Sequence, residues 1–281
     1  MIGLVHLVWA PLGPEPLRRF LHSYHAHPAG TAHELAIVLN GAGAASAGGA
    51  APAGDVTVGD GSSKDALLAE LEGTHHRLIE LDSPVLDLPA YGFAARALEH
   101  PRLCFLNSHS VILANGWLGL LSRGLEEPDV GLVGATASWE SQSEWVRGRP
   151  LYWAYQLAGL RAARRDYPRF PNPHIRTTGF MARRDALLDL DLQAARDKRA
   201  TYLLESGHRS ITRTTLERGQ RTLVVGRDGR GYDVDEWHAS HTFRSGAQEN
   251  LLIADNRTRD WQDAPPRLRR RLSRDAWGKP A

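Results

Sequence analysis

The sequence has only one cysteine, Cys104, among its 281 residues. A single thiol cannot form a disulfide within the chain, which excludes the small secreted proteins that disulfides hold together. A reducing, cytoplasmic setting is therefore expected. Cys104 lies inside an apolar run, where the expected role of the thiol is that of a small, buried and unreactive side chain.

Long hydrophobic runs are also absent. No stretch approaches the roughly eighteen consecutive apolar residues that a membrane-spanning helix needs. The apolar run over residues 2–10 has no basic residue before it and ends at Pro11, which predicts a first strand and not a signal peptide. Any contact with a membrane is therefore expected to be peripheral.

Neither sign of charge is in excess, since 34 basic and 32 acidic residues give a formal net charge of +2. This balance gives no reason to expect nucleic acid as a partner. The local exception is residues 267–271, which read Arg-Leu-Arg-Arg-Arg. Such a run fits the solvated end of a helix, and it also fits a docking patch for phosphate or for an anionic membrane.

Apolar segments alternate with amphipathic segments along most of the chain, and 42% hydrophobic residues suffice for a full core. Strands are predicted at residues 4–10, 34–40, 77–81, 103–106, 129–136 and 222–226, and helices at 16–26, 63–71, 89–100, 116–125, 151–166, 185–191 and 210–218. Strands joined by helices form parallel sheets. The sequence thus predicts an α/β fold with a mostly parallel central sheet flanked by helices.

The strand at residues 103–106 is expected to lie at the centre of this sheet, because it is apolar throughout and follows Pro101. The polar residues Asn107, Ser108, His109 and Ser110 come directly after it. In open α/β sheets, ligands bind outside the carboxyl ends of the strands. The other strand ends bring Trp9, Ala10, Asn40 and Asp87 to the same edge.

Residues 41–63 are rich in glycine, alanine and serine, which predicts a long loop. Gly41 and Gly43 follow a predicted strand, as in loops that hold a phosphate. A dinucleotide-binding loop runs straight into a helix, whereas here Pro52-Ala53-Gly54 intervenes and no helical pattern begins before Ser63. A dinucleotide-dependent dehydrogenase is therefore disfavoured.

Several short sequence segments, taken in their order along the chain, resemble those of the glycosyltransferases of the GT-A fold, family 2 type. They are Phe-Leu-Asn at 105–107, Trp117, Val-Gly-Ala-Thr at 133–136, and the segment at 172–184 that contains Thr-Thr-Gly-Phe-Met. The resemblance covers roughly residues 4–250. It implies a single GT-A (Rossmann-like) domain over residues 1–250, followed by a basic tail over residues 251–281 that docks on the domain or on a partner.

The resemblance implies transfer of a sugar from a nucleoside diphosphate sugar to a hydroxyl of a glycan or another acceptor. The expected reaction inverts the anomeric configuration and belongs to polysaccharide or surface glycan synthesis. The sequence does not indicate the donor sugar, the nucleotide, the acceptor or the state of assembly.

The chain departs from the family at the residues expected to meet the diphosphate. Family members commonly have an Asp-x-Asp pair that holds Mn²⁺ or Mg²⁺, and this chain has Asn107-Ser108-His109. His109 can bind Mn²⁺ beside a carboxylate such as Asp87, donate to phosphate in a metal-free site, or only hydrogen-bond neighbouring loops. The need for a metal is left open. The implied donor-binding residues are Trp9, Ala10, Asn40, Asp87, Asn107 and His109.

In the resembling family, an acidic residue near a helix after this region removes a proton from the acceptor hydroxyl. Glu205 is the residue that matches, which makes it the candidate catalytic base. The alternative is that Glu205 forms an ion pair with Arg209, four residues further along a helix.

Four other positions are of interest. The family places a strand near Gly179 under the acceptor, and Trp139 can either stack on a sugar or cover the core. In GT-A enzymes a C-terminal loop often folds over the donor, so His241 or His238 can reach a metal or form a polar lid without direct contact. The lost acidic pair also leaves a second interpretation, a catalytically silent protein that binds a nucleotide sugar or a glycan.

Overall fold

The computed structural model describes residues 1–42, 64–144, 161 and 163–278. Its central feature is an eight-stranded sheet with the strand order β11-β10-β6-β9-β4-β1-β2-β3. The strands are β1 (Ile2–Trp9), β2 (His33–Asn40), β3 (Arg77–Glu80), β4 (Arg102–Leu106), β6 (Val130–Gly134), β9 (Gly179–Arg183), β10 (Arg221–Val225) and β11 (Gly231–Tyr232).

The sheet is mostly parallel. Strands β3, β2, β1 and β4 run parallel to one another, as do β6 and β10. Strand β9 lies between β4 and β6 and is antiparallel to both, and β11 is antiparallel to β10. This arrangement confirms the predicted α/β fold class with its mostly parallel sheet.

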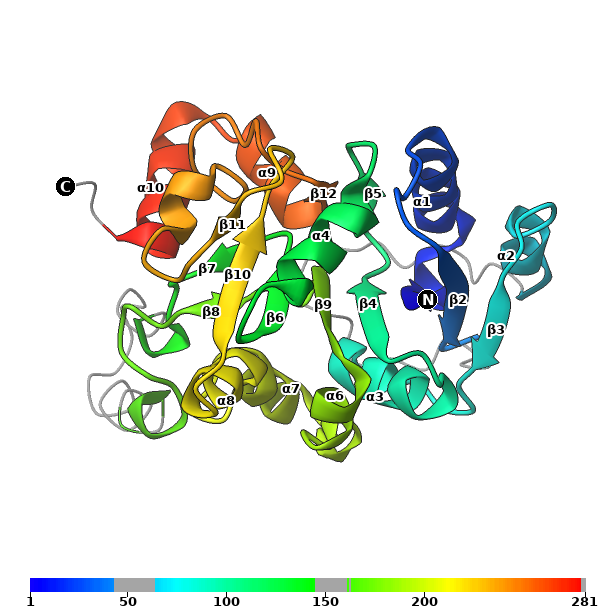
Figure 1. The fold of residues 1–281 in the computed structure, drawn as a ribbon, viewed down its shortest axis with the longest axis horizontal. Coiled ribbons are helices and arrows are strands. Elements are labelled where there is room, and N and C mark those ends of the chain that lie inside the picture. Colours follow the sequence, from blue (N-terminus) through cyan, green and yellow to red (C-terminus); the bar gives the residue numbers. More distant parts are fainter. Residues whose placement is uncertain (43–63, 145–160, 162, 279–281) are drawn as a thin grey trace.

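Helices cover both faces of the sheet, and Figure 1 shows the strands between an upper and a lower group of helices. The upper group includes α1 (Pro14–Ala26) and α4 (Trp117–Glu126), with α2 (Lys64–Glu70) at the β3 edge. The lower group comprises α3 (Asp87–Ala97), α6 (Arg184–Leu188), α7 (Lys198–Ser206) and α8 (Ile211–Glu217). Short 3₁₀ turns lie at Ala10–Leu12 (η1), Gln142–Glu144 (η2), Leu192–Ala194 (η3) and Trp237–Ser240 (η4).

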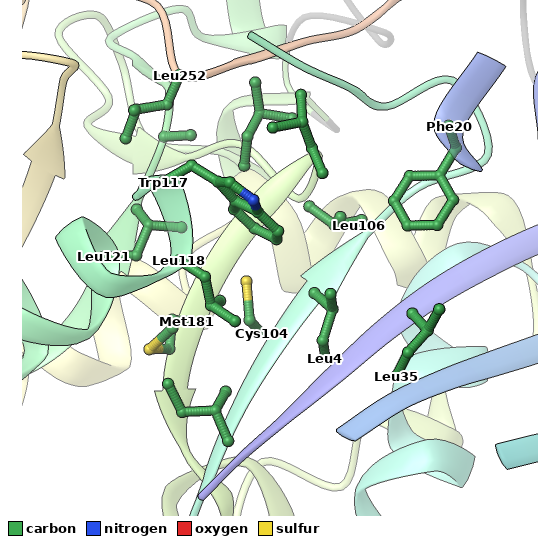
Figure 2. Packing of buried hydrophobic residues seen from close by; sticks show 14 of the residues in the cluster. Leu4, Phe20, Leu35, Cys104, Leu106, Trp117, Leu118, Leu121, Met181 and Leu252 are labelled. Atoms are coloured by element: carbon green, nitrogen blue, oxygen red, sulfur yellow. The ribbon is translucent and has the colours of Figure 1, made fainter. Parts of the chain in front are cut away.

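The two faces of the sheet carry two apolar clusters. On one face, Trp117 and Leu121 of α4 pack over Cys104 of β4, as Figure 2 shows. On the other face, Tyr91 of α3 packs against Phe105 of β4, with ring centroids 4.8 Å apart. All of β4 from Leu103 to Leu106 is fully buried, as its apolar sequence predicts.

The C-terminal segment is built into this domain. Strand β12 (Ile253–Ala254) pairs with β5 (Val111–Ile112), and Leu252 and Ile253 belong to the core. Helices α9 (Asn256–Asp263) and α10 (Pro266–Trp277) follow. A second small ribbon joins β7 (Ala137–Ser138) to β8 (His174–Ile175). Residues 252–254 thus pack with the rest of the described chain, while the division into a domain and a docking tail at residue 250 stays a prediction.

Two sequence predictions fall wholly or largely outside the described residues. Residues 43–63 of the predicted glycine-rich loop are outside the described residues. The helix predicted at 151–166 is described only at residues 161 and 163–166, which are helical. Among the described residues, no helix is both long and apolar enough to cross a membrane.

Candidate functional site

The carboxyl ends of the central strands meet at one edge, where the polar residues predicted from the sequence gather. Trp9, the last residue of β1, is in register with Asn40, the last residue of β2. The backbone N–H of Trp9 donates to the Ser108 hydroxyl at 2.9 Å, so the ends of β1 and β4 are joined directly. Ala10 follows as the buried residue of the 3₁₀ turn η1.

Residues Asn107 to Ser110 form a closed turn after β4. The side-chain oxygen of Asn107 accepts from the His109 N–H at 3.0 Å, and the Ser110 hydroxyl lies 3.1 Å from the same oxygen. The Ser110 N–H donates to the Asn107 carbonyl at 3.1 Å. The acceptor oxygen of Asn107 is therefore used to shape the turn.

Asn40 holds a neighbouring loop in place. Its amide group donates to the Val85 carbonyl at 2.7 Å, and its side-chain oxygen accepts from the Val85 N–H at 3.1 Å. Asn40 is only 1% exposed, so this two-way pairing uses a fully buried amide. It fixes the segment between β3 and α3, and with it Asp87 at the first position of α3.

Glu205 lies in the last turn of α7 and reaches the same edge through Thr177. The Thr177 hydroxyl donates to Glu205 Oε1 at 3.1 Å, and the Tyr91 hydroxyl donates to the Thr177 carbonyl at 3.3 Å. The next carbonyl, that of Thr178, lies 3.1 Å from the Ser110 hydroxyl. Glu205 and the Asn107–Ser110 turn therefore contact two successive residues, Thr177 and Thr178, directly before β9.

The sequence also allowed an ion pair between Glu205 and Arg209. In the described part of the chain, no nitrogen of Arg209 lies within 4.0 Å of a Glu205 carboxylate oxygen. Arg209 is exposed just after the end of α7.

Asp87 is electrostatically coupled to Glu205. Burial and, to a smaller extent, the negative charge of Glu205 raise the pKa of Asp87 to about 6. Burial, and secondly the charges of Asp87 and Glu205, raise the pKa of Tyr91 well above its ordinary value. Two acidic groups thus share one side of the site, and near neutral pH Asp87 accepts a proton more readily than an ordinary aspartate.

The wall beside Glu205 is apolar. A narrow space next to the carboxylate does not admit a water molecule, and it is lined by Leu132, Ile175, Thr177, Phe180, Ile211 and Thr212. This wall comes from β6, β8, β9 and α8, and it leaves the Thr177 hydroxyl as the hydrogen-bond donor to Glu205.

Two arginines, Arg176 and Arg259, lie close to this edge. Arg176 donates to the buried carboxylate of Asp255 at 2.7 Å, and its guanidinium lies 4.2 Å from the centre of the Phe243 ring. Arg259 donates to the His109 carbonyl at 3.4 Å. Burial and the positive charge of Arg259 lower the pKa of His109, which favours the neutral imidazole.

Thr177, Arg176 and Asp255 were not predicted from the sequence as residues of this edge. A sequence signal existed only for Arg176 and Thr177, which stand inside the segment that carries the family resemblance. Asp255 lies in the tail, and its contact with Arg176 spans 79 positions.

The Asn107–Ser110 turn does not by itself offer the ligands of a divalent metal ion. No group of three His, Cys, Asp or Glu side chains able to hold a metal occurs among residues 1–42, 64–144, 161 and 163–278. Mn²⁺ and Mg²⁺ prefer several oxygen ligands, whereas Asn107 uses its oxygen within the turn and His109 offers one nitrogen. The His241 side chain is 45% exposed and pairs with Glu249 at 2.5 Å.

The two residues predicted on the acceptor side have packing contacts. Trp139 donates from its indole nitrogen to the Val234 carbonyl at 3.1 Å, and its ring packs against Trp277 of α10 and His238 of η4. Of the two roles considered for Trp139, these contacts match the one that covers the core. Gly179 begins β9, where a side-chain Cβ would lie 3.1 Å from Ile253 Cδ1.

Comparison with known proteins gives matches in structure only. No protein-family model matches the sequence, and no curated protein matches it significantly. The fold is similar to solved glycosyltransferases. Mannosyltransferase PcManGT from Pyrobaculum calidifontis, in complex with GDP-Man and Mn²⁺, is 14% identical with a TM-score of 0.47, and the match covers 85% of this chain and 59% of that one.

Two further structures are similar to a lesser extent. Glucosyl-3-phosphoglycerate synthase from Mycobacterium tuberculosis, with Mn²⁺, UDP and glucosyl-3-phosphoglycerate, is 14% identical with a TM-score of 0.37, over 66% of this chain and 57% of that one. S. aureus TarS 1-349 is 12% identical with a TM-score of 0.41, over 72% and 53%. The matches span less than two thirds of the length of each of these three solved proteins. At this sequence identity, the similarity concerns the fold alone.

Proposed function

We propose that this chain is a GT-A type glycosyltransferase that moves a sugar from a nucleoside diphosphate sugar to an acceptor hydroxyl. The observation that carries the proposal is the meeting of Glu205 with the Asn107–Ser110 turn at Thr177–Thr178. A carboxylate and a polar turn that contact neighbouring residues of one segment, at the carboxyl edge of the sheet, suit a base near a donor. The resemblance of the sequence to family 2 enzymes supports the same assignment.

In the proposed reaction, Glu205 accepts the proton of the acceptor hydroxyl. The hydroxyl oxygen attacks the anomeric carbon of the sugar from the face opposite the phosphate. The new carbon–oxygen bond forms as the bond to the diphosphate breaks, and the nucleoside diphosphate leaves with the electron pair. This direct displacement inverts the anomeric configuration. The hydrogen bond from Thr177 orients the Glu205 carboxylate for the transfer.

The donor is proposed to lie along Trp9, Ala10 and Asp87, with the diphosphate near Asn107 and His109. Asn40 contributes by holding the segment that leads to Asp87, because its amide is fully engaged with Val85. The Arg259 side chain brings a positive charge to the His109 turn. No step is assigned to a metal ion, since the donor set at this turn does not suit one.

The first test is binding. Thermal melting of the full chain is measured with UDP, GDP, ADP, TDP and CMP and with the matching sugar nucleotides, each with Mn²⁺ and with EDTA. We expect one nucleotide series to raise the melting temperature by several degrees at 100 times its dissociation constant. We also expect the shift to persist in EDTA.

The second test is turnover with the sugar nucleotide that binds. Release of the nucleoside diphosphate, with and without added glycan acceptors, supports the enzyme. Binding without release under any metal condition supports the silent alternative, and the absence of binding by every nucleotide contradicts both.

A further inference from the structure

Four arginines of α10 form an exposed face that we name the arginine face: Arg267, Arg270, Arg271 and Arg274. Their spacing of three and four residues places them on one side of the helix. The face extends over about 10 Å, from the rise of about 1.5 Å per residue. All four side chains are exposed.

The opposite side of α10 fixes the helix to the domain. Ala276 is fully buried, and its carbonyl accepts from the Trp139 N–H at 2.9 Å. The indole nitrogen of Trp261 in α9 donates toward the Arg269 carbonyl and the Ser273 hydroxyl, at 3.2 and 3.1 Å. The arginine face is therefore held outward by rigid packing.

The arginine face has no ionic partner in the part of the chain that the structure describes. None of its four arginines forms an ion pair there, in contrast to Arg176, Arg221 and Arg230. Asp275 is exposed four residues after Arg271 without forming an ion pair with it. Like charges three and four residues apart repel one another, so an anionic partner would stabilise this face.

Apolar side chains border the arginine face. Leu268 and Leu272 of α10 are partly exposed, and Trp277 is partly exposed at its end. Phe170 is 36% exposed and lies against Gly278, the residue after the helix. A basic helix face beside partly exposed leucine and aromatic side chains suits a bilayer surface, which offers both anionic headgroups and acyl chains.

We infer that the arginine face of α10 is a docking surface for the headgroups of an anionic phospholipid bilayer. Each basic residue near such a surface contributes about 1 kcal/mol, or roughly fivefold in binding, at physiological salt. The binding is peripheral and reversible. This inference does not depend on the proposed glycosyltransferase activity.

The test is flotation of the full chain with vesicles. Phosphatidylcholine vesicles with and without 30% phosphatidylserine are compared at 50 and 500 mM NaCl. We expect binding to the anionic vesicles at low salt, with a loss of at least tenfold at high salt and no measurable binding to neutral vesicles. Equal binding to both kinds of vesicle, or to neither, overturns the inference.

A pair of variants with equal charge localises the effect. Changing Arg267, Arg270, Arg271 and Arg274 to Gln is expected to reduce vesicle binding at least tenfold. The control changes four arginines on other parts of the surface to Gln, namely Arg77, Arg123, Arg196 and Arg213. Circular dichroism and thermal melting establish that both variants are folded. Equal binding by the two variants contradicts the inference.

Nucleic acid is the competing partner for a basic face. Fluorescence anisotropy with a labelled 20-nucleotide single strand and a duplex, at the same salt concentrations, compares it directly. The membrane assignment is overturned if the single strand or the duplex binds more tightly than the anionic vesicles do and if the variant with four Gln residues in α10 loses this nucleic-acid binding.

Discussion

Glu205 is held by one hydrogen bond from Thr177 and faces an apolar wall, so its carboxylate can be altered with little effect on the fold. Glu205→Gln keeps the shape and the contact with Thr177 but removes the ability to accept a proton. We expect a loss of turnover of about 10²- to 10⁴-fold, the usual contribution of a general base. Donor binding should change by less than about twofold.

The matched control for this prediction is Glu217→Gln, an exposed glutamate at the end of the neighbouring helix α8. It should retain full turnover. Initial rates and nucleotide melting shifts, measured for both variants, separate chemistry from binding. A Glu205→Gln protein with normal turnover would remove Glu205 from the mechanism.

His6 is a buried residue whose protonation opposes folding. Its ring stacks on Phe20 with centroids 3.6 Å apart, and neither ring nitrogen has a hydrogen-bond partner. Burial, and secondly the charge of His109, lower the pKa of His6 from 6.5 to about 3. The unfolded chain therefore takes up this proton at a higher pH than the folded chain does.

The sign of the effect follows from that difference. Between pH 6.5 and about 3, the free energy of unfolding should fall by about 1.4 kcal/mol per pH unit on account of this one group. Above pH 6.5 the group has no effect. His6→Leu should remove this part of the slope, as urea unfolding at pH 7.5, 5.5 and 4.5 can measure. The same acid slope in both proteins would contradict this account of His6.

Among the elements, α9 depends on one buried carboxylate. Asp255 caps the helix by accepting from the Thr258 N–H at 2.8 Å and completes a capping box with the Thr258 hydroxyl. The same side chain pairs with Arg176. Arg176, Thr178 and Thr258 hold the pKa of Asp255 below its usual value, although burial opposes this shift.

Asp255→Ala leaves the Arg176 charge without its buried partner and removes the cap. We expect a loss of about 3 kcal/mol in the free energy of unfolding, as for other broken buried pairs. Asp255→Asn should lose less, because an amide oxygen can still accept from Thr258. Asp263→Ala, an exposed aspartate at the end of α9, is the control and should be neutral. Urea midpoints at pH 7 test the order of the three variants.

At the scale of the whole molecule, the chain beyond residue 250 completes the core. Leu251, Leu252 and Ile253 are all buried, and β12 pairs with β5 directly after the Asn107–Ser110 turn. A chain that ends at residue 250 is therefore expected to lose cooperative melting or to aggregate. A chain that ends at residue 278 should melt like the full protein. A cooperative transition in the shorter chain would support residues 1–250 as an independent domain.

Most of the architecture could be predicted because its signals are local. The alternation of strand and helix patterns gave the fold class, and the apolar run at 103–106 identified the buried central strand. The polar residues after the strands indicated the edge where Trp9, Asn40 and Asn107 come together. Each of these inferences uses a spacing of a few residues, which the chain carries in its own hydrophobic pattern.

The contacts within the edge could not be predicted in this way. The pairing of Asn40 with Val85, the hydrogen bond from Thr177 to Glu205, and the ion pair of Arg176 with Asp255 join residues 45, 28 and 79 positions apart. Nothing in the sequence around Asn40 distinguishes an amide that holds a loop from one that binds a ligand. The sequence around Trp139 likewise does not predict its ring contacts with Trp277 and His238, which come from distant segments.

The sequence by itself thus determined the order of strands and helices, the burial of β4 and the edge of the sheet that collects polar residues. Only the tertiary structure decided which of those polar groups are engaged with one another and that the arginine face of α10 points outward. The physical reason is that hydrophobic periodicity acts over neighbouring residues. Hydrogen bonds and ion pairs depend on the positions of side chains that packing brings together from distant segments.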